Sequence, residues 1–249
     1  MELFERLSGA RMHTALYKPF NLTNTINYNY IIRDVLFIVN RGSRFICGSF
    51  MSLLNNRSLK TRLSGVGKLS TSKLNSYGIT GVIARSSGIA LDFRVTNENN
   101  YSKIYNNLNI ISFIGSKGDC FDRFVVRSKE IIESFRLVLQ VCSVISLQLV
   151  NNSSLSRFKS MEGVIESFKV NSSWLSYSNG LFSSTVEGPK GLIKCNIVIS
   201  CNYLPYRLQV RSPVAHNMNL ISSLSNGVNF ADFVATFCSI DVVLGEIDR

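Results

Sequence analysis

The sequence of 249 residues has little of what catalytic triads and metal sites require. It contains two histidines, His13 and His216, and no serine, histidine and aspartate spacing that indicates a triad. Its six cysteines are scattered without a CxxC pair, whereas zinc and iron–sulfur sites usually use tighter pairs. From these residues alone we expect structural histidines, reduced and mostly buried thiols, no catalytic residue and no bound metal.

The sequence also lacks an apolar run long enough to span a bilayer. The longest such run, residues 137–150, contains Gln140 and Gln148 and is shorter than the roughly 20 residues that a transmembrane helix needs. The opening residues, MELFERLSGARMH, carry two glutamates and lack the apolar core of a signal peptide. We therefore predict that residues 137–150 form a buried helix.

Acidic residues are scarce, with 16 against 27 lysines and arginines, which leaves a net charge of +11. This balance favours an acidic partner, either nucleic acid, an anionic membrane surface or an acidic protein. The basic stretch 60–73 has no interleaved aromatics or RNA-binding signature, so a solvated loop is the simpler interpretation. Its GVGKLS segment fails the phosphate-loop pattern at Arg62 and Leu69. An organellar RNA-binding protein remains an alternative.

Helical periodicity dominates what is present, and 45% hydrophobic residues predict a substantial core. Apolar residues recur at helical spacing over residues 1–16, and residues 29–57 indicate a second helix, broken near Gly42. The clearest helix covers residues 118–146 and begins at Asp119, which can cap it.

A polar stripe follows this third helix. Arg123, Arg127 and Glu130 share one face at helical spacing. The stripe is either a solvated face with ion pairs between neighbouring turns or a polar seam inside a helix bundle.

The second half of the chain changes character. Residues 160–170 predict a short amphipathic helix, residues 180–213 are β-rich with a turn at EGPKG, and residues 219–249 return to helix and end in an extended tail. Glycines in residues 74–94 predict tight turns or a close backbone approach. The result is an α+β fold in one partial domain, with a helical bundle over roughly 1–180 and a β-rich part with a docked tail over roughly 181–249.

One carboxylate in the tail needs an explanation. Asp241 lies between Ile240 and Val242, where burial is costly unless the carboxylate has a partner or a task. A helix cap, or a buried ion pair with Arg207 or Arg211, would be a structural explanation.

Several short motifs occur together along the chain. They are residues 5–13 (ERLSGARMH), 118–123 (GDCFDR) with Arg127 and Glu130, 161–162 (ME), 187–191 (EGPKG), 205–207 (PYR), 211–213 (RSP) and 241–249 (DVVLGEIDR). Together they resemble the 49 kDa subunit of respiratory complex I, also called NADH dehydrogenase subunit 7. The resemblance covers essentially the whole chain.

The resemblance implies a fold and a site. The family is related to the large subunit of nickel–iron hydrogenases, which is a helical bundle with small flanking sheets. In the complex I subunit the metal has been lost, and the cavity binds the ubiquinone head group. Asp241 and Val243 match positions that line the quinone cavity. His13 matches a residue beside the terminal iron–sulfur cluster, where a hydrogen bond can tune the cluster's potential.

The resemblance also implies a function in a complex. The chain would be a core subunit of the proton-translocating NADH:ubiquinone oxidoreductase, with FMN and iron–sulfur clusters on partner subunits and ubiquinone as substrate. It would bind no cofactor directly and have no activity alone. Its partners would be a PSST-type cluster subunit, a 30 kDa-type subunit and a membrane-arm subunit, without nucleic acid. Its place would be the matrix-side peripheral arm at the mitochondrial inner membrane.

The sequence departs from the family in several ways, and SNGVNF at 225–230 is one of them. The family chain is longer by about its first third, and we expect a separate polypeptide to supply that N-terminal part. SLSRFKS at 154–160 replaces a proline-rich stretch. The other alternative is an assembly scaffold that has lost its chemistry, which would tolerate alanine at Asp241 or His13.

Overall fold

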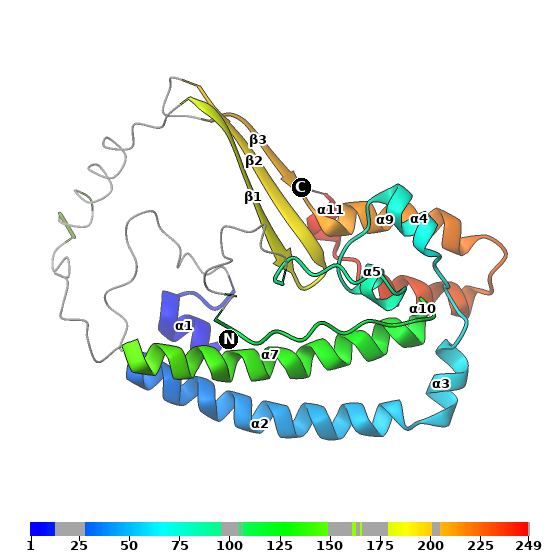
Figure 1. Ribbon diagram of the computed structural model, residues 1–249, viewed down its shortest axis with the longest axis horizontal. Helices are drawn as coiled ribbons and strands as arrows, with labels where there is room; N and C mark the ends of the chain where they lie inside the picture. Colours follow the sequence, from blue (N-terminus) through cyan, green and yellow to red (C-terminus); the bar gives the residue numbers. More distant parts are fainter. Residues whose placement is uncertain are drawn as a thin grey trace.

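The computed structural model describes residues 1–12, 28–95, 105, 107–148, 161–162, 165, 179–200 and 205–248. In chain order the elements are α1 (Glu2–Ser8), α2 (Tyr28–Leu54), α3 (Arg57–Leu63), α4 (Thr71–Tyr77), α5 (Val82–Ser86), α7 (Cys120–Gln148), β1 (Gly180–Gly188), β2 (Gly191–Ile199), β3 (Pro205–Arg211), α9 (Pro213–Ser225), α10 (Phe230–Ile240) and α11 (Leu244–Ile247). Helices and a small sheet thus occur together, as the predicted α+β class requires (Figure 1).

Helices α2 and α7 lie side by side and run in opposite directions (Figure 1). The rings of Phe50 and Phe124 meet edge to face with centroids 6.0 Å apart. The break predicted near Gly42 is wrong, because α2 continues through it. A helical glycine costs only about 1 kcal/mol relative to alanine. A Cβ at Gly42 would lie 3.3 Å from the Phe135 ring, so glycine allows the two helices to approach closely.

The first helix is shorter than predicted. It ends at Ser8 because Gly9 adopts the left-handed conformation, with φ of 77°, and its N–H bonds to the carbonyl of Glu5. Arg6 pairs with Asp34 and so ties α1 to α2. The predicted continuation through Met12 is therefore wrong, and residues 13–16 lie outside the described part of the chain.

The start of α7 confirms the predicted cap. One oxygen of Asp119 accepts the N–H of Asp122 at 2.8 Å, and the other accepts the N–H of Gly65 at 3.0 Å. A single buried carboxylate thus begins the helix and also anchors the loop before α4.

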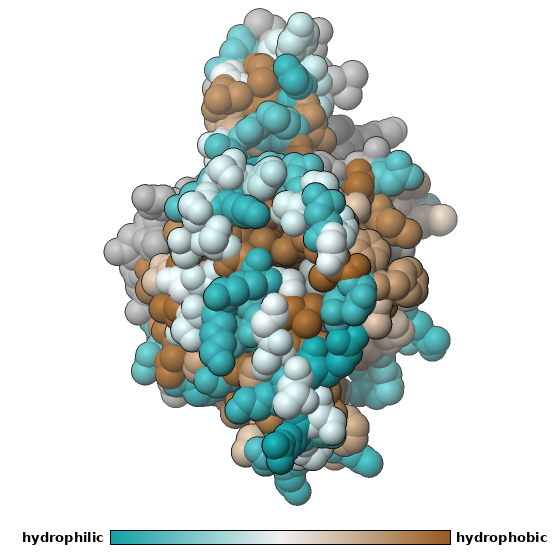
Figure 2. All heavy atoms as spheres, turned by 90° about the vertical axis from the view of Figure 1, so that its right-hand side faces the viewer, coloured by the Kyte–Doolittle hydropathy of each residue, from teal (hydrophilic) through white to brown (hydrophobic). Residues whose placement is uncertain are grey.

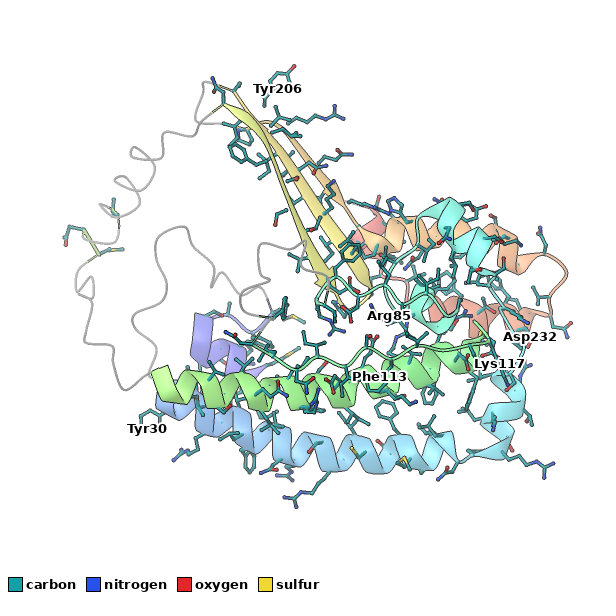
Figure 3. All side chains as sticks on the ribbon, in the orientation of Figure 1. Tyr30, Arg85, Phe113, Lys117, Tyr206 and Asp232 are labelled. Atoms are coloured by element: carbon teal, nitrogen blue, oxygen red, sulfur yellow. The ribbon has the colours of Figure 1, made fainter. Side chains whose placement is uncertain are left out.

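An extended segment, residues 107–117, runs along α7 (Figure 3). Its backbone donates to carboxylates of the helix: Ile111 N–H to Glu133 at 3.1 Å and Lys117 N–H to Asp122 at 2.7 Å. Carboxylates of α7 satisfy these backbone groups in place of a neighbouring strand.

The sheet is antiparallel in the order β1–β2–β3, and the predicted EGPKG turn joins the first two strands. The turn packs against the segment before α5. A Cβ at Gly81 would lie 2.6 Å from the Cα of Gly191, and the Leu192 N–H donates to the Thr80 hydroxyl at 2.9 Å. The close backbone approach predicted for residues 74–94 is confirmed here.

The main apolar core lies at one end of the molecule, among α4, α5, α9 and α10 (Figure 1). It consists of Leu69, Leu74, Ile79, Ile83, Leu220 and Ile240. The far part of α7 is helical as predicted, but its predicted burial is wrong in this chain, since Val138, Leu139 and Val144 are exposed.

The free end of the sheet projects from the body and carries exposed apolar side chains (Figure 2). Leu181, Phe182, Tyr206 and Leu208 are exposed there. Among the described helices, none combines the length and the apolar character needed to cross a membrane. The helix predicted for residues 160–170 lies almost wholly outside the described residues.

Candidate functional site

The polar stripe of α7 is a buried seam. Arg123 is 0% exposed, and Arg127 and Glu130 on the same face of the helix are at most half-exposed. The three side chains face α5, α10 and the loop before α4. The solvated-face interpretation is therefore wrong, and the polar-seam interpretation is confirmed.

Arg123 joins three segments that are distant in sequence. Its guanidinium donates to the carbonyls of Gly67 and Gly118, both at 2.9 Å, and to the Ser239 hydroxyl at 3.0 Å. Burial lowers the pKa of Arg123, although the nearby Cys120 thiol partly opposes this. Gly67 has φ of 60°, and a Cβ there would lie 2.8 Å from the Arg123 guanidinium. The glycine of the rejected phosphate-loop pattern thus makes room for an arginine.

Arg127 holds the end of α10 from the next turn of the seam. It donates to the carbonyl of Ser239 at 3.1 Å. Burial lowers the pKa of Arg127, and the charge of Asp241 opposes that shift. Two arginines of α7 therefore hold Ser239 and so position the residue that caps the end of α10.

That residue is Asp241, and its environment differs from the predicted one. It is the C-cap of α10, with its N–H bonded to the carbonyl of Cys238 at 3.2 Å. Its φ of 59° makes it the one non-glycine residue in the left-handed region among those described. Such a conformation costs about 1–3 kcal/mol and is common at functional sites. The helix-cap explanation is confirmed, in the form of a backbone cap.

The Asp241 side chain is 49% exposed, so its predicted burial is wrong. Its cationic neighbour is Lys190 of the EGPKG turn, with Nζ 3.7 Å from Oδ2. The alternative pairing with Arg211 is wrong because this guanidinium donates to the Gly78 carbonyl instead. Val243 is the N-cap of α11 and is half-exposed. Thus Asp241 is a strained, accessible carboxylate beside two cations.

A second charged cluster centres on Arg85, between α7 and the base of the sheet (Figure 3). Its guanidinium donates to Glu130 at 2.7 Å, to Glu187 at 2.9 Å and to the Leu91 carbonyl at 3.1 Å. Burial opposes the charge of Arg85, but the two carboxylates outweigh it and raise its pKa. The sequence alone does not point to Arg85, because its partners lie 45 and 102 residues away and leave no local spacing signal.

Asp92 and Arg94 complete this cluster. Arg94 binds both carboxylate oxygens of Asp92, at 3.0 and 2.8 Å, and Asp92 also lies 4.0 Å from Arg85. Burial would raise the pKa of Asp92, but the hydrogen bonds from Arg94 lower it below its ordinary value. This carboxylate is held in its ionised form.

The histidines and the basic stretch have separate outcomes. His13 lies outside the described residues. His216 is half-buried with Nδ1 3.1 Å from the Ser212 carbonyl, a structural role as predicted.

The stretch 60–73 is partly helical, so the loop prediction is wrong there, and its Arg62 pairs with Asp232 of α10.

The described cysteines are free thiols. Cys120 and Cys142 are buried, Cys47 and Cys195 are partly buried, and Cys238 is exposed, so the expectation of mostly buried thiols is wrong. Cys201 lies outside the described residues. In the described part of the chain, no three His, Cys, Asp or Glu side chains gather as a metal site would require.

The whole chain, residues 1–249, matches the family described as "Respiratory-chain NADH dehydrogenase, 49 Kd subunit". It is 36% identical over 255 residues to the "NADH-ubiquinone oxidoreductase 49 kDa subunit" of Nyctotherus ovalis, across 100% of this chain and 62% of that one. The protein of the same name from Paramecium tetraurelia is 33% identical, across 100% and 66%. Its counterpart from Acanthamoeba castellanii, again with the same name, is 33% identical, across 100% and 63%. The chain thus spans 62% to 66% of the length of these relatives.

Proposed function

Because the chain belongs to the family of the 49 kDa subunit of respiratory-chain NADH dehydrogenase, we propose that it forms part of the quinone-reducing site of an NADH:quinone oxidoreductase. One observation supports the location of that site. Three motifs that are far apart in sequence meet at the end of α10. They contribute Arg127 of α7, Lys190 of the EGPKG turn and Asp241 of the tail. The accessible group at their meeting point is the Asp241 carboxylate.

The chemistry of this point suits a quinone head group. Reduction of a quinone to a quinol takes two electrons and two protons, and it needs polar groups at the ring oxygens. Asp241 offers a carboxylate that can accept a hydrogen bond from a quinol hydroxyl, and Lys190 offers an ammonium donor. The half-exposed Val243 offers an apolar contact to the ring. Arg123 and Arg127 act as positioning residues through Ser239.

We place the electron carriers on partner subunits, with an iron–sulfur cluster on a PSST-type neighbour next to the quinone and FMN at the NADH-oxidising end. The chain itself would bind no cofactor. His13 would approach the neighbour's cluster and tune its potential. Quinone reduction at this site would drive proton translocation in the complex.

The assembly follows from the same proposal. The protein would contact PSST-type, 30 kDa-type and membrane-arm subunits on the matrix side of the mitochondrial inner membrane. Its fold would be that of the nickel–iron hydrogenase large subunit.

The test is Asp241→Asn in the assembled complex, which keeps the size of the side chain and removes its charge. We expect NADH:quinone activity to fall at least about tenfold, the scale of a lost acid–base or charged contact, while NADH oxidation by an artificial acceptor is unchanged. Asp232→Asn on the same helix is the matched control, because Asp232 pairs with Arg62 away from the site. Unchanged quinone reduction in the Asp241 variant would exclude the proposed site and favour a scaffold.

A further inference from the structure

We infer that the outward face of α2 is a docking surface for another polypeptide, whose contacting surface is acidic and also carries apolar side chains. The residues of this face, which we call the arginine–aromatic face, are Arg33, Phe37, Arg41, Arg44, Phe45 and Met51. The inference does not rest on the proposed quinone site. It needs only that the chain assembles with other polypeptides, as do its relatives that are named as subunits.

The six side chains share one side of the helix. They recur at spacings of three, four or seven residues, and residues at these spacings lie one above the other on an α-helix. All six are exposed, Phe37 at 63% and Phe45 at 76%. From Arg33 to Met51 the face is about 27 Å long, at a rise of about 1.5 Å per residue.

The opposite side of α2 already has its partner. Val39 is buried there, Phe50 meets Phe124 edge to face, and Gly42 lies against the Phe135 ring of α7. In Figure 1, α7 lies above α2, and α2 forms the lower border of the body. Packing on α7 therefore explains the apolar residues of that side, but it does not explain the exposed rings of the arginine–aromatic face.

The arginines of the face lack acidic partners in the described part of the chain. Residues 35–91 contain no Asp or Glu, and the one acid of α2, Asp34, pairs with Arg6. Arg41 and Arg44 take part in none of the ion pairs between described residues. A protein that covers the face without carboxylates would bury two unpaired charges, which is strongly unfavourable. Charge complementarity thus requires an acidic partner.

The residue types of the face are those of protein interfaces. Arginine, aromatic residues and methionine are enriched where partners meet, whereas lysine and glutamate are depleted there. Every cation of α2 is an arginine, and the helix contains no lysine. A guanidinium binds a carboxylate through two parallel hydrogen bonds, which lysine cannot do. The face therefore suits carboxylates that lie beside apolar groups on a protein.

The mixing of charged and apolar residues argues against an anionic membrane as the partner. A helix that lies on a membrane separates its apolar side from its charged side. On α2, Arg41 and Phe45 are one turn apart on the same side, and Arg44 lies beside them. Insertion of the rings into lipid would carry these guanidiniums to the same depth. Nucleic acid can also pair with arginines and stack on rings, so the experiment has to distinguish it from a protein.

The experiment places photoreactive p-benzoylphenylalanine at position 45 in the assembled complex and identifies the cross-linked product by mass spectrometry. We expect a peptide of another polypeptide that is rich in Asp and Glu and carries a net negative charge. A cross-link to lipid, to nucleic acid, to another segment of this chain or to a peptide without acidic residues would overturn the inference.

A charge reversal tests whether the arginines hold the partner. Arg44→Glu should lower the cross-link yield from position 45 at least about tenfold, because a carboxylate would then face the partner's acids. Arg207→Glu is the matched control, since Arg207 is also exposed, the change in net charge is the same, and β3 lies away from α2 (Figure 1). It should leave the yield unchanged. Equal yields in the two variants would contradict the role of the arginines.

The wild-type complex gives a check that needs no variant. Phenylglyoxal modifies accessible guanidiniums, and it should modify Arg41 and Arg44 at least about tenfold more slowly than the arginine of a short unstructured peptide, because an interface excludes water and reagent. Equal rates would show that the arginine–aromatic face is free in the complex, and the inference would be wrong. The Asp241→Asn test is separate, so either proposal can fail without the other.

Discussion

The two ends of α7 have environments opposite to those that the hydropathy of their residues suggests. The first turns carry Arg123, Arg127 and Glu130, and these charged side chains are buried or partly buried. The far turns carry Val138 and Leu139, and these apolar side chains are exposed in this chain, Leu139 at 44%. The difference shows that the partners available in the fold decide burial, and that the polarity of the residue itself does not.

The near end supplies those partners from four segments. The charges of the seam are satisfied by carbonyls of the loop before α4, of the start of α7 and of the end of α10, and by the guanidinium of α5. Buried polar groups that are fully bonded favour one arrangement of the elements, because removing any partner leaves another group unsatisfied. The near end therefore specifies how α5, α7 and α10 meet, and so where Asp241 lies.

Breaking the near end should have the largest effect. Arg123→Met keeps much of the volume but leaves the Gly67 and Gly118 carbonyls and the Ser239 hydroxyl without their donor. We expect the free energy of unfolding to fall by about 3–5 kcal/mol. Urea unfolding followed by circular dichroism measures this.

The matched control is the exposed Arg41 of α2, which should tolerate methionine with a change of about 0.5 kcal/mol or less. A loss below about 1 kcal/mol in Arg123→Met would contradict the importance given to the buried network.

A pair of glycines sharpens the comparison at the same end. Gly65 and Gly67 both have positive φ, at 78° and 60°, so alanine strains either position. At Gly65 a Cβ meets nothing within 4 Å, whereas at Gly67 it would lie 2.8 Å from both Arg123 and Thr236. We expect Gly65→Ala to cost about 1 kcal/mol and Gly67→Ala about 2–4 kcal/mol.

Thermal and urea unfolding of the two variants side by side would measure the difference. Equal losses would show that backbone strain alone explains both, and that the close approach to Arg123 contributes nothing.

The smallest effect is expected at the far end. Leu139→Gln replaces an exposed apolar side chain, so it should change the free energy of unfolding of the isolated chain by about 0.5 kcal/mol or less. The same exchange at Val126, which is buried near the seam, should cost at least about 2 kcal/mol. Similar losses at the two positions would mean that the two ends of the helix do not differ as described.

Local signals predicted the elements whose causes are local. Asp119 caps α7 because its side chain reaches the backbone three residues later, and the EGPKG turn joins two strands that are adjacent in sequence. The predicted helix break at Gly42 was wrong, because a local rule for helix breaking takes no account of the Phe135 ring that packs against the glycine. It also failed at Asp241, whose apolar neighbours in sequence suggested a burial that the fold does not provide.

The candidate site was predicted only in part. The motifs identified Asp241 and Val243, but Lys190, the cationic neighbour of Asp241, lies 51 positions earlier in the sequence. Arg85 gave no signal at all, because its two carboxylate partners come from α7 and β1. His13 stays a prediction, since it lies outside the described residues.

The sequence by itself determined the family, the α+β class, the polar stripe of α7 and the hairpin, because motifs, periodicity and capping act over a few residues. Only the tertiary structure decided that the stripe is buried, that Asp241 remains accessible beside Lys190, and that Arg85 meets acids from three separate segments. The physical reason is that solvation and charge balance depend on every group within a few ångströms, and those groups come from distant parts of the chain.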